Sequence, residues 1–164
     1  MSDANKPQPD NRKSTTAPAM AAPDVANLAW AAGFLDGEGC IHIVKQRYKN
    51  RSSVGYRLGV NVAQNDRPAL EALCSAVGIK SPIYATKRAR NHSRQCYTVN
   101  FSGRSAWLLL STVMPYLRRK SREAGAALEF WVKGRMGIPA NGKRVDPELT
   151  AIREYYYLLL RQLK

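Results

Sequence analysis

Two hydrophobic periodicities alternate along the chain. Apolar and small residues fill positions 28–35 with helical spacing, whereas from Ile41 onward the apolar residues recur at every second position. After a turn region at residues 50–55, the same alternation continues from Tyr56 to Gln64. Because side chains repeat about every 3.6 positions on a helix face and every two on a strand face, this pattern predicts a helix followed by a β-hairpin.

The helix and hairpin pattern then occurs a second time. Asp66 is placed to cap a helix that has Pro68 in its first turn and ends at Gly78. A strand pattern beginning at Ile83 and another ending at Phe101 form the second predicted hairpin. Each hairpin has one apolar face and one polar face, so one side of the sheet should pack on helices while the other stays open.

Further helices are predicted at residues 105–117, with a break near Pro115, at 121–133 and at 148–163, after a Gly- and Pro-containing loop at 134–147. The element order αββαββα, with these C-terminal helices added, predicts an α+β fold. Its four-stranded antiparallel sheet should have helices on one face and a concave, basic saddle on the other.

The chain divides into a tail and one domain. Residues 1–23 contain four prolines among small and polar residues, and they have too little apolar surface to order themselves, so a flexible tail is predicted. A targeting leader is the alternative, although Asp3 and Asp10 argue against it. Residues 24–164 are long enough for a single domain, whose first helix should be capped by Asp24 or Asn27.

Charge narrows the class of partner. The net charge is +14, with 26 Lys and Arg against 12 Asp and Glu, and a nucleic acid is the commonest polyanion that such an excess fits. Residues 40–65 hold five basic side chains and no acid, and residues 79–107 hold six and none, so the cations follow the predicted hairpins. No long apolar run or signal peptide is present, which predicts a soluble, intracellular protein with no membrane partner. The three widely spaced cysteines predict neither a disulfide framework nor a zinc site.

Two acids stand where the first helix ends. Asp36 and Glu38 alternate with Gly37 and Gly39, although the partial negative charge of a helix C-terminus disfavours carboxylates by about 0.3 to 1 kcal/mol. A hard cation such as Mg²⁺, held by one or two carboxylates and by substrate phosphate, would explain them. The alternative is a glycine-capped core helix with two solvated acids. Three small residues at helical spacing would let a partner helix approach closely: Ala29, Ala32 and Gly33.

The segment Gly33 to Gly39, read Gly-Phe-Leu-Asp-Gly-Glu-Gly, closely resembles the motif that names the LAGLIDADG homing endonucleases. Its single occurrence resembles the homodimeric type, and the similarity in element order extends over about residues 25–132. The resemblance implies a site-specific double-strand DNA endonuclease that acts on a long pseudo-palindromic site. It also implies hydrolysis with a divalent metal, Mg²⁺ by default, which leaves short 3′ overhangs.

The same resemblance implies roles for particular residues. Glu38 matches the acid that binds the catalytic metal, where the family more often has Asp, and the carbonyl of Gly37 matches an additional ligand. Asp36 matches a structural acid that ties helix ends together. Gln64 and Lys120 match a water-ordering amide and a basic residue of the catalytic pocket, and a further basic residue of that pocket aligns near Arg67 or Pro68, without a unique match.

The outward face of the hairpins supplies the predicted DNA contacts. Arginine can pair with guanine, and Asn or Gln with adenine, in the major groove. The predicted base-reading residues are Gln46, Tyr48, Arg57, Asn61, Arg88, Arg90 and Thr98, and the predicted phosphate contacts are Lys45, Arg47, Lys49 and Arg94. The alternative for each is an ordinary solvated strand residue.

Two other functions remain open at this stage. A catalytically lapsed member of the same family would be an intron-RNA maturase or a DNA-binding regulator, and the intact acid at Glu38 argues against it. An RNA-binding protein of ribosomal type would explain the charge but not the motif.

Overall fold

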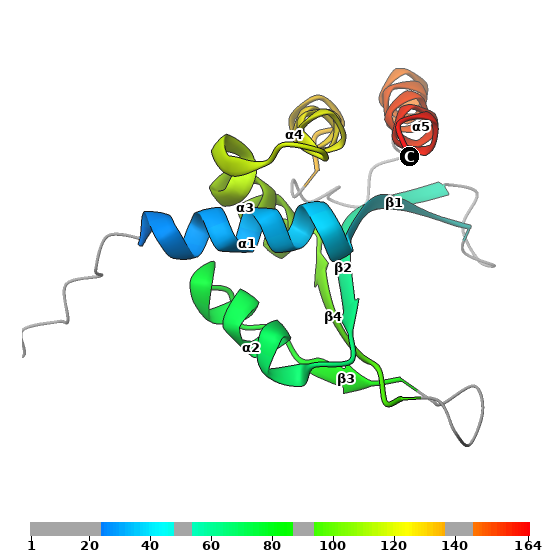
Figure 1. Ribbon diagram of the computed structural model, residues 1–164. Coiled ribbons are helices and arrows are strands. Elements are labelled where there is room, and N and C mark those ends of the chain that lie inside the picture. Colours follow the sequence, from blue (N-terminus) through cyan, green and yellow to red (C-terminus); the bar gives the residue numbers. More distant parts are fainter. Residues whose placement is uncertain (1–23, 48–53, 87–93, 137–145) are drawn as a thin grey trace, which may run out of the picture.

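The computed structural model describes residues 24–47, 54–86, 94–136 and 146–164. Along the chain the elements are α1 (Val25–Glu38), β1 (Gly39–Arg47), β2 (Val54–Gln64), α2 (Arg67–Ala76), β3 (Ile83–Ala85), β4 (Tyr97–Ser102), α3 (Arg104–Val113), the short 3₁₀ helix η1 (Met114–Tyr116), α4 (Ser121–Lys133) and α5 (Pro147–Gln162) (Figure 1). This order confirms the predicted αββαββα pattern. The predicted tail at residues 1–23 lies outside the described residues.

The four strands form one antiparallel sheet in the order β1-β2-β4-β3. The two predicted hairpins therefore meet through their second strands, with Gly59 to Gln64 of β2 paired to Ser102 to Tyr97 of β4. Strand β1 is consequently an edge strand of the described sheet.

The two faces of the sheet differ as the alternation predicted. Tyr56, Leu58, Val60 and Val62 are at most 7% exposed and face the helices, whereas Arg57 between them is exposed. Figure 1 shows α1, α2 and α3 on one side of the sheet, which curves so that its other side is hollow. The predicted α+β fold with one open, concave sheet face is confirmed.

Local signals explain where the helices begin and end. Asp24 caps α1 by accepting a hydrogen bond from the Ala26 N–H at 3.0 Å, so Asp24 rather than Asn27 is the cap. The helix at 105–117 breaks into the 3₁₀ turn at Pro115, which has no N–H to continue the helix. Asp66 stands at the start of α2 but its side chain makes no cap hydrogen bond.

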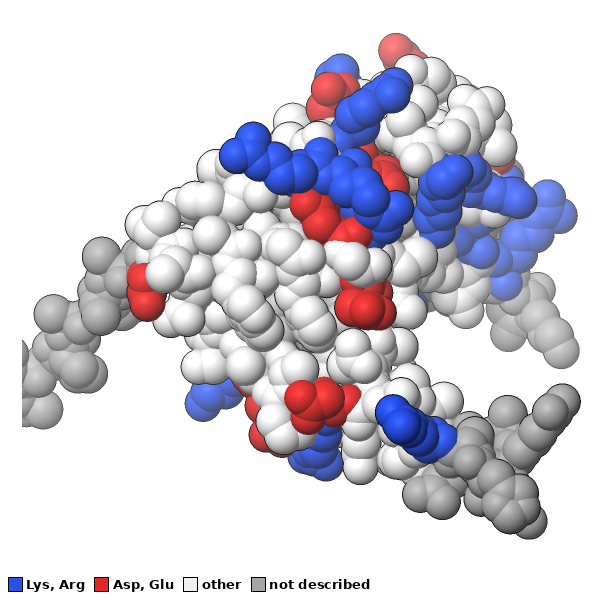
Figure 2. Space-filling model, viewed as in Figure 1, with Lys and Arg blue, Asp and Glu red and all other residues white. Residues whose placement is uncertain are grey.

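The C-terminal helix packs on the body. α5 lies against α4 and β1, with Tyr156 and Leu160 at most 4% exposed in the same core as the sheet. Lys and Arg side chains gather where the start of α4 and the end of α5 approach each other (Figure 2). The three cysteines are free, as predicted. Among the described residues, no helix has the length and apolar character that crossing a membrane requires.

Candidate active site and nucleic-acid interface

Asp36 joins the end of α1 to the turn at residues 118–120 that precedes α4. Its Oδ2 accepts hydrogen bonds from the backbone N–H groups of Arg118 and Arg119 at 2.7 and 3.2 Å, and its Oδ1 accepts one from Lys120 at 2.8 Å. These three N–H groups belong to the turn at residues 118–120, directly before the first helical residue Ser121, so the carboxylate holds that turn and does not cap α4 itself. Asp36 therefore has the predicted structural role of a tie, which runs from the end of α1 to the turn before α4.

These hydrogen bonds govern the ionisation of Asp36. Burial alone raises the pKa of a carboxyl, but the N–H groups of Lys120, Arg118 and Arg119 outweigh it and hold the pKa of Asp36 below its ordinary value. The carboxylate is therefore the form that the folded protein favours.

Two cations meet on the carbonyl oxygen of the same residue. The Lys120 Nζ donates to the Asp36 carbonyl at 2.6 Å and the Arg119 Nε donates to it at 2.8 Å. Lys120 is only 5% exposed, and burial, followed by the charge of Arg119, lowers the pKa of Lys120. The structure thus places the Lys120 ammonium at the C-terminal end of the motif helix, where cations are favourable.

Glu38, the last residue of α1, differs from Asp36 in having no partner. Its side chain is exposed and makes no hydrogen bond or ion pair with any residue that the structure describes. Gly37 is exposed beside it, and carbonyl groups in the last turn of a helix have no donor within the helix. Gly39 is required at the exit, because a Cβ there would lie 2.7 Å from the Leu35 carbonyl oxygen.

The donor set at this helix end fits Mg²⁺. The Glu38 carboxylate and the Gly37 carbonyl are hard oxygen donors, and Mg²⁺ typically takes one or two carboxylates while keeping waters and phosphate oxygens. Across the described ranges, no cluster of three or more His, Cys, Asp and Glu side chains could hold a metal. A closed structural zinc site, which needs such a cluster, therefore does not fit this part of the chain.

Gln64 makes no hydrogen bond to Glu38 or Lys120. Gly39 pairs with Val62 across β1 and β2, so Gln64 lies two residues beyond that pair on β2. Its Oε1 accepts a hydrogen bond from the N–H of Asn65 at 2.8 Å. Arg67 forms an ion pair with Glu71 at 2.8 Å along α2, and Pro68 follows it in that helix.

The predicted base-reading residues that can be placed lie on the open face. Gln46 and Arg57 are exposed on β1 and β2, and Asn61 is half-buried beside them. Thr98 of β4 is half-buried and shares a 3.2 Å hydrogen bond with Thr86. The remaining base-reading residues, Tyr48, Arg88 and Arg90, and the phosphate contact Lys49 lie outside the described residues.

The predicted small-residue face of α1 needs one correction. Ala29 and Gly33 are exposed, but Ala32 is 0% exposed in the hydrophobic core and has no surface to offer a partner. Sequence reasoning missed Trp30, which is 42% exposed and stacks on Phe34 with ring centroids 5.3 Å apart. The sequence signal that could have identified Trp30 is its position three residues before Gly33, which places the two residues close together on the helix surface.

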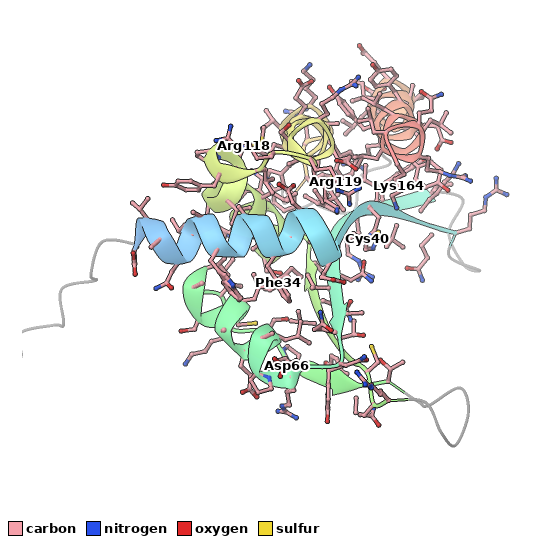
Figure 3. All side chains as sticks on the ribbon, viewed as in Figure 1. Phe34, Cys40, Asp66, Arg118, Arg119 and Lys164 are labelled. Atoms are coloured by element: carbon pink, nitrogen blue, oxygen red, sulfur yellow. The ribbon has the colours of Figure 1, made fainter. Side chains whose placement is uncertain are left out.

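Sequence reasoning also missed the chain's last described residue. Lys164 follows α5 and its Nζ lies 3.3 Å from the Cys40 Sγ, although the two residues are 124 positions apart. Figure 3 shows Lys164 beside Cys40 and Arg119, where α1 passes into β1. Nothing in the local sequence around Lys164 indicated this proximity.

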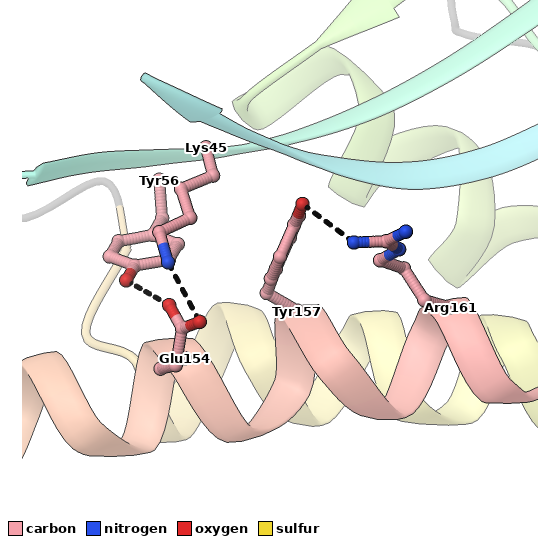
Figure 4. A network of polar contacts seen from close by, with 5 residues as sticks. All are labelled: Lys45, Tyr56, Glu154, Tyr157 and Arg161. Carbon is pink, nitrogen blue, oxygen red and sulfur yellow. Dashed lines mark hydrogen bonds and ion pairs between the residues drawn. The ribbon is translucent and has the colours of Figure 1, made fainter. Parts of the chain in front are cut away.

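Two carboxylate contacts attach α5 to the first hairpin. Glu154 forms a 2.7 Å ion pair with Lys45 and accepts a hydrogen bond from the Tyr56 hydroxyl (Figure 4). Burial and the neighbouring Glu154 raise the pKa of Tyr56 to about 12, so the hydroxyl keeps its proton. Lys45, predicted to contact phosphate, is instead engaged with α5 in this structure.

Comparisons with known proteins agree on a family and a fold. A sequence model described as LAGLIDADG endonuclease matches residues 31–125. The homing endonuclease I-CvuI, solved with the I-CreI target and Mg, has a TM-score of 0.65 and 22% identity, covering 85% of this chain and 82% of that chain. The archaeal intron-encoded homing endonuclease I-Vdi141I, complexed with DNA, has a TM-score of 0.64 and 17% identity, covering 85% and 84%.

Several of the similar structures are much longer chains. The LAGLIDADG homing endonuclease I-GzeII, in complex with its DNA target, has a TM-score of 0.58 and 16% identity, covering 82% of this chain but only 43% of that chain. At these identities the structural likenesses establish the fold alone. A comparison with curated protein sequences gives no significant match.

Proposed function

Because the chain belongs to the LAGLIDADG endonuclease family, we propose that it is a site-specific double-strand DNA endonuclease that works as a homodimer. The observation that carries the proposal is Glu38, an exposed carboxylate without a partner among the described residues, at the end of the motif helix. The helices α1 to α5 share one hydrophobic core, so residues 24–164 would act as a single domain. Its place of action would be inside the cell, where DNA is the available polyanion.

The chain's own residues divide the chemical work. Glu38 and the Gly37 carbonyl would hold Mg²⁺, which when bound supplies Lewis-acid chemistry at a phosphodiester. Lys120, anchored on the Asp36 carbonyl, would place its positive charge near the phosphate, and Gln64 would order water. Each protomer would cut one strand, and motif helices meeting at a twofold axis would give short 3′ overhangs.

The open sheet face would bind the target duplex. A two-stranded β-ribbon fits the major groove of B-DNA, and β1 with β2 and β3 with β4 provide two such ribbons. Arg57, Gln46 and Asn61 are accessible for base edges on the first ribbon, and Thr98 on the second. Tyr48, Arg88 and Arg90 would extend these contacts.

Two observations support a homodimer. Ala29 and Gly33 leave an exposed part of α1 nearly free of side chains, so a second copy of the helix could approach closely there. The chain also accounts for less than half of I-GzeII, as one copy of a twofold unit would. A symmetric pairing of α1 would bring two Glu38 side chains together.

Gly33→Arg should separate dimerisation from folding. A Cβ added at Gly33 meets nothing within 4 Å in the protomer, so the free energy of unfolding of the variant should stay within about 1 kcal/mol of that of the parent. A cation buried between two helices is costly, and the dimer dissociation constant should rise at least about a hundredfold. Sedimentation velocity over a range of concentrations measures it, with Ala151→Arg, at an exposed position of α5, as the control. If Gly33→Arg left the dimer dissociation constant unchanged while Ala151→Arg raised it, the Ala29 and Gly33 face of α1 would not be the dimer interface.

Cleavage itself is tested by incubating the full chain with a library of randomised duplexes, once with Mg²⁺ and once with EDTA, and sequencing the cut ends. We expect discrete cuts with short 3′ overhangs within a pseudo-palindromic site with Mg²⁺, and none with EDTA because Glu38 and Gly37 alone cannot activate water. Enrichment of bound duplexes without any cut would instead indicate a DNA-binding regulator or a maturase.

A further inference from the structure

Two cavities meet beneath the end of α5. The first, of about 290 Å³, lies between the start of β1 and the start of α4, and its lining includes Gly39, Cys40 and Lys120. The second, of about 220 Å³, continues along β1 at His42 and Ile43. Lys164 lines both, so the two cavities are neighbours along the edge strand, and together they are here called the α5 groove. It begins at Gly39, directly after Glu38.

Cations outnumber acids in the α5 groove. Arg119, Lys120, Arg161 and Lys164 line it, against the single carboxylate of Glu123. The ion pairs found within the described residues are Lys45 with Glu154, Arg67 with Glu71 and Lys133 with Glu129, and none includes a cation of the groove. The side chains that line the two cavities therefore carry more positive than negative charge, and none of these cations is held in an ion pair among the described residues.

The outer two cations retain hydrogen-bonding capacity. The Lys164 Nζ donates to the Cys40 Sγ at 3.3 Å, and a thiol is a weak acceptor. The Arg161 Nη1 donates to the Tyr157 hydroxyl at a long 3.4 Å (Figure 4). Both groups carry further N–H donors, which an incoming anion could engage more strongly.

Helix stability accounts for part of this charge. A cation near a helix C-terminus is favourable, which explains Arg161 in the last turn of α5 and the Arg119 and Lys120 side chains on the Asp36 carbonyl at the end of α1. Lys164 lies beyond the end of α5 and is directed to β1 rather than to the last carbonyls of its own helix.

We propose that the α5 groove binds the DNA backbone beside the phosphodiester that Glu38 addresses, with Arg161 and Lys164 as its outer phosphate contacts. The inference rests on the proposed function for the position of the scissile phosphate. Phosphate contacts of this kind hold the duplex in register without reading its sequence. The groove starts at Gly39, directly after Glu38, so a strand with a phosphate at Glu38 would pass beside Arg119 and Lys164.

Salt dependence of binding tests the groove. In the full chain, Arg161→Gln with Lys164→Gln should flatten the slope of log K against log salt by about 1.8, because each lost phosphate contact removes about 0.9. The loss of affinity should be the same for random duplexes and for the preferred site, measured in EDTA so that cleavage plays no part. Lys164→Gln alone leaves α5 intact and should flatten the slope by about 0.9.

Arg122→Gln with Arg135→Gln is the matched control, because it removes two exposed cations that line neither cavity. An unchanged slope in the groove variants, or an equal change in the control, would overturn the inference. If the parent cleaves DNA but the groove variants keep its salt slope, the groove proposal is wrong and the endonuclease proposal stands. If the parent never cleaves DNA but the groove variants have the flattened slope, the groove proposal stands and the endonuclease proposal is wrong.

Discussion

Replacing Glu38 by Gln is expected to lower the cleavage rate at least about a thousandfold while DNA affinity stays within about threefold. The amide has nearly the same size but no charge, so it removes the one unpaired carboxylate at the motif end. Metal coordination at a phosphodiester is worth several kcal/mol of transition-state stabilisation, and about 4 kcal/mol corresponds to a thousandfold. Single-turnover cleavage of the preferred duplex and a binding isotherm in EDTA measure the two quantities.

Two companion variants sharpen that test. Glu148→Gln removes an exposed carboxylate in the first turn of α5 and should leave cleavage unchanged. Glu38→Asp keeps the charge on a side chain one methylene shorter and should retain most activity, since oxygen ligation is preserved. Full cleavage by Glu38→Gln would remove Glu38 from the site. Equal loss in Glu38→Gln and Glu38→Asp would indicate a structural role instead of ligation.

Most of the fold could be predicted because its signals are local. The alternation from Tyr56 to Gln64 separates a buried row from an exposed row, and the structure has the same rows. Pro115 lacks an N–H and stops α3 whatever surrounds it. The small extent of β3, Ile83–Ala85, was not readable, because strand length depends on pairing with β4 rather than on its own residues.

The site could be predicted only in part. Asp36 and Glu38 were found because two acids at a helix C-terminus contradict the helix dipole, and the structure then distinguishes the paired Asp36 from the unpaired Glu38. Ala32 was assigned wrongly because a small side chain carries no sign of whether it faces the core or a partner. The α5 groove depends on contacts between Lys164 and Cys40 across the whole domain, which no local pattern encodes.

Asp36→Ala is expected to destabilise the protein by about 3 kcal/mol at neutral pH. Its carboxylate accepts hydrogen bonds from the three backbone N–H groups of residues 118–120. A hydrogen bond to a charged group contributes about 1.5 to 3 kcal/mol, and a partly buried donor that is left unsatisfied costs about 1 to 3 kcal/mol. Asp66→Ala is the matched control, because Asp66 precedes α2 without making a side-chain cap bond and should cost little. Urea unfolding of the two variants beside the parent gives the free energies.

The pH dependence of this difference separates the effect of the charged hydrogen-bond acceptor from simple loss of packing. The pKa of Asp36 is lower in the folded protein than its ordinary value of 3.8, so its stabilisation is complete above the unfolded pKa and is lost as pH falls through the folded one. The stability gap between the parent and Asp36→Ala should therefore be constant near neutral pH and shrink below about pH 4. The gap between the parent and Asp66→Ala should stay small throughout. If the difference in free energy of unfolding between the parent and Asp36→Ala did not change in acid, the Asp36 side chain would stabilise the protein by packing alone. The tie between the motif helix and Lys120 would then not depend on charge.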